Sequence, residues 1–198
     1  LNPTEGTLWV DGMDTKDEDN IWKVRQTAGM VFQNPDNQII GQVVEEDVGF
    51  GPENMGIPTE EIWQRVEESL RAAGMYEYRK YSPNKLSGGQ KQRLSIARAI
   101  AKHPDVYIFD DSFSALDYKT DATLRAELKE ETAESTVMIV AQRISTILHA
   151  DQIIVLEDGQ IVGKGTHKEL LKNCEAYYQI ASSQLSEKEL EEDLKEVE

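Results

Sequence analysis

The hydrophobic and polar positions of the chain change their period several times, and each change marks an element. Residues 6–12 alternate apolar and polar side chains, which is typical of an exposed strand, and the apolar run at residues 27–33 predicts a buried strand. Residues 59–73 follow a helical period, opening at Thr59 with an acidic first turn and stopping at Gly74. Their apolar face consists of Ile62, Val66 and Leu70. A β region therefore gives way to a small helical subdomain.

The second half of the chain alternates helices with apolar strands. A strong amphipathic helix begins near Gly89 and is ended by Pro104. Three apolar runs follow, and their alternation with helices implies parallel strands joined by helical crossovers. The runs are residues 106–110, 136–142 and 152–159. A tight hairpin then leads to Thr166 and Glu169, which have the spacing of a capping box. The pattern predicts an α/β fold.

These patterns divide the chain into four regions. Residues 1–40 form the β part of the core, residues 41–104 the helical subdomain with the long helix, residues 105–183 the main α/β core, and residues 184–198 an acidic helical tail. The tail carries a thin apolar stripe of Leu190, Leu194 and Val197. We expect the tail to be solvated or packed on a partner rather than to carry a function.

Composition removes several classes of function. The formal net charge of -16, with 29% charged residues, disfavours nucleic-acid binding, which needs a basic face. No apolar run is long enough to span a bilayer, and the first residues lack the features of a signal peptide. The single cysteine, Cys174, excludes an internal disulfide and is expected to be a small buried side chain. These features predict a soluble protein of a reducing, cytosolic compartment.

The first candidate for chemistry is the N-terminal end of the long helix, which we call its entrance. Ser87, Gly88 and Gly89 precede the helical run there. The first N–H groups of a helix lack internal partners and carry part of the helix dipole, so they attract anions. Glycine lets a ligand approach the backbone, and the Ser87 hydroxyl can cap the helix or bind the same anion. An ordinary serine-capped turn is the alternative for this string alone.

The longer string is more specific. LSGGQ, formed by Leu86, Ser87, Gly88, Gly89 and Gln90, resembles the signature motif of the ATP-binding cassette (ABC) ATPases. This resemblance implies a P-loop NTPase-like core, with a parallel sheet and flanking helices, an antiparallel β piece and a small helical subdomain. In that family two cassettes face each other head to tail, and the signature of one contacts the γ-phosphate of ATP held by the other.

A second motif, VYIFDD, ends an apolar strand with two carboxylates. Asp110 should lie at the carboxyl edge of the sheet, where open α/β sheets bind ligands, and its hard oxygens suit Mg²⁺. By resemblance this is the Walker B strand, and Asp110 is the Mg²⁺ carboxylate. The next family residue is usually a glutamate that polarises the attacking water; here it is Asp111, one methylene shorter.

Three further residues gain roles only from the resemblance. Gln33 matches the Q-loop glutamine, which senses Mg²⁺ and water, and Asp117 belongs to SALD, which matches the D-loop at the interface of two cassettes. Asp117 is also a suitable helix N-cap. Gln142 stands where the family generally has the switch histidine. Its neutral amide can bond a phosphate oxygen but cannot carry the charge of an imidazolium.

The phosphate-loop pattern G-x-x-x-x-G-K-[ST] does not occur in the 198 residues. The nearest string, residues 159–166, is one residue short and sits in the predicted hairpin. By resemblance the chain begins downstream of the phosphate loop and its strand, which suggests a fragment. Residues 1 to about 90 look like the ATPase subunits of energy-coupling-factor vitamin and cobalt importers. Residues from about 86 to 198 look like the degenerate cassette of a heterodimeric multidrug exporter.

The resemblance implies an ATP-binding subunit of an ABC transporter, with ATP and Mg²⁺ as cofactors. Its partners would be a second cassette, in a homo- or heterodimer, and a transmembrane subunit docked near residues 33–53 at the inner face of the cell membrane. The alternative is a non-catalytic module that donates its signature to an intact cassette, or an inactive fragment. Chromosome-maintenance ATPases share the motifs, but the charge and the lack of long heptad stretches disfavour them.

Overall fold

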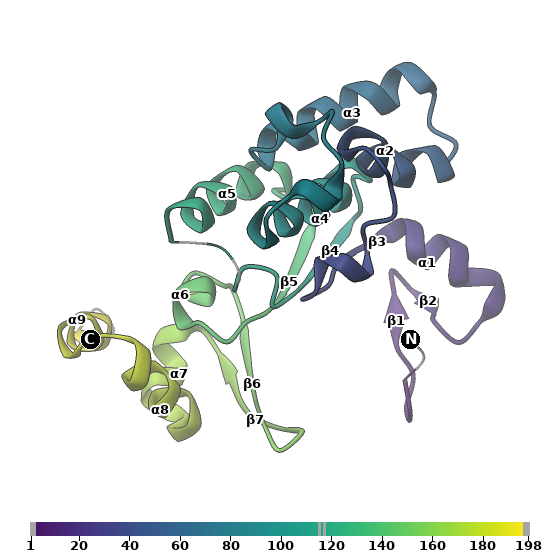
Figure 1. The fold of residues 1–198 in the computed structure, drawn as a ribbon. Coiled ribbons are helices and arrows are strands. Elements are labelled where there is room, and N and C mark those ends of the chain that lie inside the picture. Colours follow the sequence, from purple (N-terminus) through teal and green to yellow (C-terminus); the bar gives the residue numbers. More distant parts are fainter. Residues whose placement is uncertain (1–2, 115, 117, 196–198) are drawn as a thin grey trace. The chain divides into compact units, whose positions relative to one another are not determined.

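The structure is a computed structural model that describes residues 3–114, 116 and 118–195, with side chains except at residues 118, 119, 194 and 195 (Figure 1). The chain forms two compact units, Leu1–Val140 and Ala141–Glu198. The boundary between them falls inside the region that the sequence assigned to the main α/β core.

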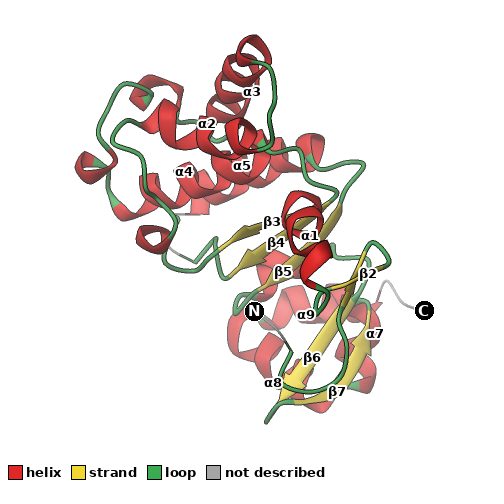
Figure 2. Ribbon diagram, turned by 90° about the vertical axis from the view of Figure 1, so that its right-hand side faces the viewer, coloured by secondary structure: helices red, strands yellow, loops and turns green. Residues whose placement is uncertain are grey.

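The first unit is built on a parallel sheet with the strand order β3-β4-β5. These strands are Ala28–Val31, Val106–Asp110 and Thr136–Val140. The β3 residue Met30 pairs with Ile108 of β4, which pairs with Met138 of β5. All three strands therefore end at one edge, as the alternation of strands and helices predicted. Figure 2 shows them side by side.

Helices cover this sheet and form the helical subdomain. They are α1 (Ile21–Thr27), α2 (Val44–Asn54), α3 (Thr59–Ala72), α4 (Gly88–Ala101) and α5 (Tyr118–Glu131), with short 3₁₀ turns at Glu18–Asn20, Pro35–Asn37, Tyr76–Tyr78 and Pro83–Lys85. The predicted apolar face of α3 is confirmed, because Ile62, Val66 and Leu70 are buried. Gly74 follows α3 with a positive φ of 61°, the left-handed conformation that ends many helices.

The body of α4 is the centre of this core. Leu94, Ile96 and Ile100 are buried on it, and the equally buried Ala97 and Ala101 let neighbouring elements approach its backbone. Helices α2 and α3 and strand β3 all contact α4. The long amphipathic helix predicted from the sequence is thus a central helix of the unit.

The N-terminal strand predicted over residues 6–12 is wrong in extent. The segment forms a hairpin of two short strands, β1 (Trp9–Val10) and β2 (Met13–Asp14), with Val10 paired to Met13. Asp11 and Gly12 make the two-residue turn, with φ values of 48° and 71°. Such Asp-Gly turns match the twist of a hairpin, so the turn chemistry decided against one longer strand.

The second unit contains an antiparallel pair and four helices within its described residues. The strands are β6 (Ile153–Glu157) and β7 (Gln160–Gly165), and the helices are α6 (Ile144–Ile147), α7 (His167–Asn173), α8 (Glu175–Gln184) and α9 (Glu187–Lys195). The hairpin prediction is confirmed, because Glu157 pairs with Gln160 across an Asp158–Gly159 turn. Parallel pairing was also expected for this run, but the only strand partner of β6 in the described chain is β7.

Capping and burial in the second unit follow the sequence. The predicted capping box is confirmed, since the Thr166 amide donates to Glu169 at 2.7 Å and the Glu169 amide donates to the Thr166 hydroxyl at 3.4 Å. The amide and the hydroxyl of Thr166 both donate to the Glu169 carboxylate, which lowers its pKa. Cys174 is buried as expected, and Leu190 packs α9 into the core. The other predicted tail positions, the Leu194 side chain and Val197, lie outside the described residues.

Candidate functional site

The N-terminus of α4, its entrance, is capped by side chains of the chain itself and is exposed to solvent. Ser87 is the N-cap: its hydroxyl accepts from the Gln90 amide at 3.3 Å, while the Gln90 side chain accepts from the Ser87 amide at 2.8 Å. Ser87 and Gly88 are both exposed. The first-turn N–H groups beyond this capping box have no carbonyl within the helix to bind. The entrance is therefore a rigid set of donors that faces out of the fold.

The glycine at position 88 is not explained by the fold of this chain. Its φ is not positive, and a Cβ added there would meet no atom of the described residues within 4 Å. Neither backbone strain nor packing thus requires a glycine. A bare backbone at this position would let a group from outside the chain approach closely.

Leu86 has a different position from the other signature residues. Its side chain is only 7% exposed and belongs to the apolar core. It follows the Pro83–Lys85 turn, and its own amide donates to the Pro83 carbonyl at 3.1 Å. Leu86 therefore anchors the turn that leads into the entrance, while Ser87 and the two glycines form its surface.

A second group of predicted residues meets at the carboxyl edge of the parallel sheet. Asp110 ends β4 there, as predicted. Gln33 follows β3, and its Nε2 donates to Asp111 Oδ2 at 2.9 Å. The buried Ser112 hydroxyl donates to the Val31 carbonyl at 3.0 Å and fixes the two strand ends to each other. Residues far apart in sequence are thus assembled at one edge.

This edge is suitable for a hard cation. The Asp110 carboxylate, the Asp111 carboxylate and the Gln33 amide oxygen are all oxygen donors, and Mg²⁺ typically takes one or two carboxylates together with substrate phosphates. Within the described residues no three His, Cys, Asp or Glu side chains are grouped so that they could hold a metal ion. The donor set fits Mg²⁺ shared with a nucleotide rather than a structural metal.

The backbone at Asp111 is in the left-handed region, with a φ of 45°. Its amide donates to the Val140 carbonyl at 2.9 Å, and its carbonyl accepts from the Ser114 hydroxyl at 2.8 Å. These contacts hold a conformation that non-glycine residues seldom adopt. This left-handed conformation turns the backbone out of β4 immediately after Asp110.

The positions of two other predicted residues relative to this edge stay predictions. Gln142 belongs to the second unit, where its carbonyl accepts from Gln184 Nε2 at 2.9 Å and Gln184 Oε1 accepts from the Ile144 amide at the same distance. Its relation to the carboxyl edge of the first unit is therefore left as a prediction. Asp117 lies outside the described residues.

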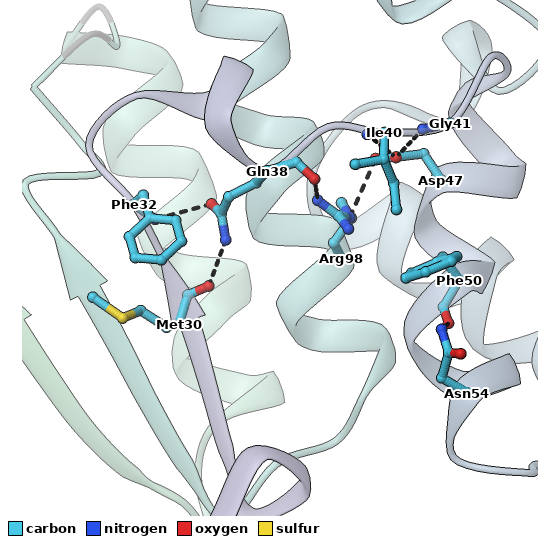
Figure 3. A network of polar contacts seen from close by, with 9 residues as sticks. All are labelled: Met30, Phe32, Gln38, Ile40, Gly41, Asp47, Phe50, Asn54 and Arg98. Atoms are coloured by element: carbon cyan, nitrogen blue, oxygen red, sulfur yellow. Dashed lines mark hydrogen bonds and ion pairs between the residues drawn. The ribbon is translucent and has the colours of Figure 1, made fainter. Parts of the chain in front are cut away.

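A network that the sequence analysis missed holds the segment after Gln33 (Figure 3). Gln38 Oε1 accepts from the Phe32 amide at 2.9 Å and Nε2 donates to the Met30 carbonyl at 2.8 Å, so the side chain of Gln38 pairs with the backbone around the end of β3. Arg98 on α4 donates to the Gln38 carbonyl. The segment is therefore tied to both β3 and α4.

A second partner of Arg98 is Asp47 on α2, whose side chain is fully buried. Arg98 Nε lies 3.2 Å from Asp47 Oδ2, and Asp47 Oδ1 accepts from the amides of Ile40 and Gly41 at 2.9 and 2.7 Å. Burial lowers the pKa of the Arg98 guanidinium, and Asp47 offsets part of that lowering. A Cβ on Gly41 would lie 2.7 Å from Asp47 Cβ, so this approach requires glycine.

A hollow lies beside this network. Its volume is about 420 Å³, and its walls include the aromatic side chains of Trp22 and Phe50 together with Met30, Arg98 and Lys102. Trp22 and Phe50 are about half exposed. Exposed aromatic side chains at the rim of a concave surface are typical of a binding surface for another macromolecule.

We expect Asp47→Ala to destabilise the first unit by about 3–5 kcal/mol, because the change leaves Arg98 buried without its carboxylate and removes the acceptor of two amides. Asp36→Ala is the matched control, since it breaks an exposed ion pair with Lys91 and should cost at most about 1 kcal/mol. Urea unfolding of both variants measures the difference. Equal losses would show that the Asp47 pair is no more important than a surface contact.

We expect Asp111→Gly to be more stable than Asp111→Ala by about 1 kcal/mol, because only glycine relieves the left-handed backbone. Both variants remove the carboxylate and its hydrogen bond from Gln33, so their comparison isolates the strain. The measurement is the difference between their urea unfolding free energies. An alanine variant as stable as the glycine variant would contradict the backbone conformation at Asp111.

Comparison with known proteins identifies the family. A family model described as ABC transporter matches residues 1–114. The energy-coupling factor transporter ATP-binding protein EcfA1 of Clostridium novyi (strain NT) is 49% identical over 175 residues, which are 87% of this chain. The chain spans 62% of the length of that relative.

Solved structures share the fold. A bacterial Atm1-family ABC exporter with ATP bound matches with a TM-score of 0.81 at 26% identity, over 94% of this chain and 33% of the exporter chain. The ATP-binding cassette MJ0796, in a dimeric post-hydrolysis state with ADP and Pi, matches with a TM-score of 0.75 at 33% identity, over 84% of this chain and 75% of the cassette. These likenesses confirm the predicted α/β fold of parallel and antiparallel sheets with flanking helices.

Nowhere in the described part of the chain is there a helix with the length and apolar character needed to cross a bilayer. The predicted family membership is confirmed by a model that covers more than half of the 198 residues. The chain belongs to the ABC transporter family, and within it resembles the ATP-binding proteins of energy-coupling-factor transporters.

Proposed function

We propose that the chain is the ATP-binding part of an energy-coupling-factor transporter and acts in a head-to-tail pair of cassettes. The observation that carries this proposal is the open entrance of α4, with Ser87 as its cap and Gly88 free of any packing role. In the pair, the first-turn N–H groups of this entrance bind the terminal phosphate of ATP seated on the other cassette. The identity of 49% with EcfA1 supports the transporter class.

The carboxyl edge supplies the groups for hydrolysis. Asp110 would hold Mg²⁺ together with the nucleotide phosphates, and the ion would neutralise charge that develops on them. Asp111 would orient the attacking water, although its side chain is one methylene shorter than glutamate. The hydrogen bond from Gln33 fixes the carboxylate of Asp111 and leaves the Gln33 amide oxygen as an acceptor for water or the metal.

The remaining predicted residues have supporting roles in this proposal. Gln90 holds the N-cap through its hydrogen bond with Ser87, and Leu86 anchors the turn from below. Gln142 would bond a phosphate oxygen as a neutral sensor, and Asp117 would cross the interface between two cassettes. Both of these roles rest on the resemblance alone.

A transmembrane transporter subunit is the proposed second partner. The hollow beside Arg98, with Trp22 and Phe50 on its walls, supports docking of a short helix from that subunit. Docking would cover the exposed aromatic side chains of Trp22 and Phe50, which gives a physical reason for their exposure in a chain of net charge -16. Such docking would hold the chain against the inner face of the cell membrane.

The relatives support the energy-coupling-factor class for most of the chain. The alignment with EcfA1 spans 175 residues, so the likeness to energy-coupling-factor proteins extends beyond the first 90 residues. The finer prediction of an exporter-like part from about residue 86 onward stays a proposal, supported only by the likeness to the Atm1-family exporter.

We expect the 198-residue chain by itself to bind Mg-ATP more weakly than micromolar. It lacks the G-x-x-x-x-G-K-[ST] pattern, whose backbone amides and lysine surround the phosphates, and one helix entrance offers few donors. Isothermal titration calorimetry with Mg-ATP measures the affinity. Micromolar binding would show that these residues hold a complete nucleotide site of their own.

A second function is favoured by Asp111 and Gln142, which stand where the family usually has a glutamate and a histidine. The chain can act as a non-catalytic partner that only donates its signature to an intact cassette. This role uses Ser87 and the following glycines but needs neither Asp110 nor Asp111. The two proposals therefore differ in whether substitution of Asp110 or Asp111 changes the ATP turnover of the pair.

We expect the chain to raise the ATP turnover of a complete cassette of the same transporter class, and Ser87→Arg to abolish the gain by filling the entrance. Ser183→Arg is the matched control, because it adds the same side chain at an exposed position of α8. Phosphate release at saturating ATP measures the effect. If Asp111→Asn retains the full gain, the chain is only a donor; if Ser87→Arg and Ser183→Arg behave alike, the entrance has no role.

A further inference from the structure

Gln92 is a buried polar residue that packing does not explain. It lies on α4 with only 1% of its surface exposed. Its Nε2 donates to the Phe32 carbonyl at 3.2 Å, while its Oε1 is buried without a hydrogen-bond partner among the described residues. An unsatisfied buried amide oxygen destabilises a fold, and an apolar side chain of the same size would avoid that penalty. Stability is therefore a poor reason for glutamine here.

The group that Gln92 holds is adjacent to the candidate site. Phe32 directly precedes Gln33, and its two backbone polar atoms are each bound by a glutamine side chain. Gln38 Oε1 accepts from the Phe32 amide at 2.9 Å, and Gln92 donates to the Phe32 carbonyl. The peptide between Phe32 and Gln33 is thus fixed by a contact from α4. That peptide sets the point from which the Gln33 side chain reaches Asp111.

The other contacts between α4 and this segment act further away. Lys91 pairs with Asp36 through an ion pair whose aspartate is well exposed, and such pairs hold geometry weakly. Arg98 binds the Gln38 carbonyl and so acts on Phe32 only through Gln38. Gln92 is the described α4 side chain that bonds the peptide next to Gln33 directly.

We propose that Gln92 is a positioning residue, which holds the Phe32–Gln33 peptide so that the Gln33 amide meets the Asp111 carboxylate. The same helix begins at the entrance formed by Ser87, so α4 fixes both parts of the candidate site. Any effect of this positioning on ATP hydrolysis rests on the proposed function. The positioning itself is a property of the chain without nucleotide, and its test needs none.

The test follows the side-chain amide resonance of Gln33 by NMR in the full chain near neutral pH. Asp111→Asn removes the charge that this amide faces, so it should shift the resonance clearly in the native background. In the Gln92→Leu background most of that shift should be lost, because the amide no longer meets residue 111. Gln33→Ala identifies the resonance by its disappearance.

Ser95→Ala is the matched background, since Ser95 is an equally buried α4 residue whose hydroxyl also lacks a described partner. It should leave the Gln33 shift unchanged. Gln92→Met repeats the test with a flexible side chain of similar volume, in case leucine prevents folding. Both Gln92 variants should keep a melting temperature close to that of the native chain, because removal of the unsatisfied Oε1 offsets the loss of the hydrogen bond to the Phe32 carbonyl.

Two results would overturn the positioning role. A full Gln33 shift in both Gln92 backgrounds would show that the pair with Asp111 forms without this contact. A large fall in melting temperature with the shift retained would make Gln92 a packing residue. Failure of the chain to stimulate a complete cassette would count against the proposed function and leave the NMR result standing, so the two failures are distinguishable.

Discussion

The first unit depends on one constraint on helix α4. The central part of the helix must be buried, while its N-terminus must stay exposed to solvent. Leu94, Ala97 and Ile100 pack the body against other elements, and the capping box at Ser87 completes the first turn without covering it. A helix held at many points along its body cannot tilt independently of the sheet. The donors at its entrance therefore keep a fixed direction relative to the carboxyl edge of β4.

Buried polar contacts carry this rigidity to the segment after β3. Asp47 accepts two amides and faces Arg98, while Gln38 and Gln92 bind the backbone on either side of Phe32. Asp47, Gln38 and Gln92 each form hydrogen bonds to backbone groups of residues 30–41. An irregular segment thus acquires a single conformation, which is what a site built partly on a loop requires.

The sequence predicted what periodicity and local motifs encode. The apolar runs located β3, β4 and β5, and the spacing of Ile62, Val66 and Leu70 gave the buried face of α3. Arg98 was missed because a charged side chain within an amphipathic pattern indicates a solvated face, and its partner lies on another helix. Its only signal was its place inside the apolar stretch SIARAI. The pairing of β6 was missed because an apolar run does not specify its neighbour.

The candidate site likewise has features that the sequence predicted and features that it did not. Motif spacing was sufficient to place Asp110 at the sheet edge and Ser87 at a helix entrance, because each depends on the local element. The bond between Gln33 and Asp111 depends on the register of β3 against β4 and on the direction of the peptide at Phe32. A glutamine and an aspartate can each be replaced by similar residues without altering any local pattern. Geometry of this kind is fixed by tertiary contacts such as that of Gln92, so the residues that orient a site are harder to recognise than those that act in it.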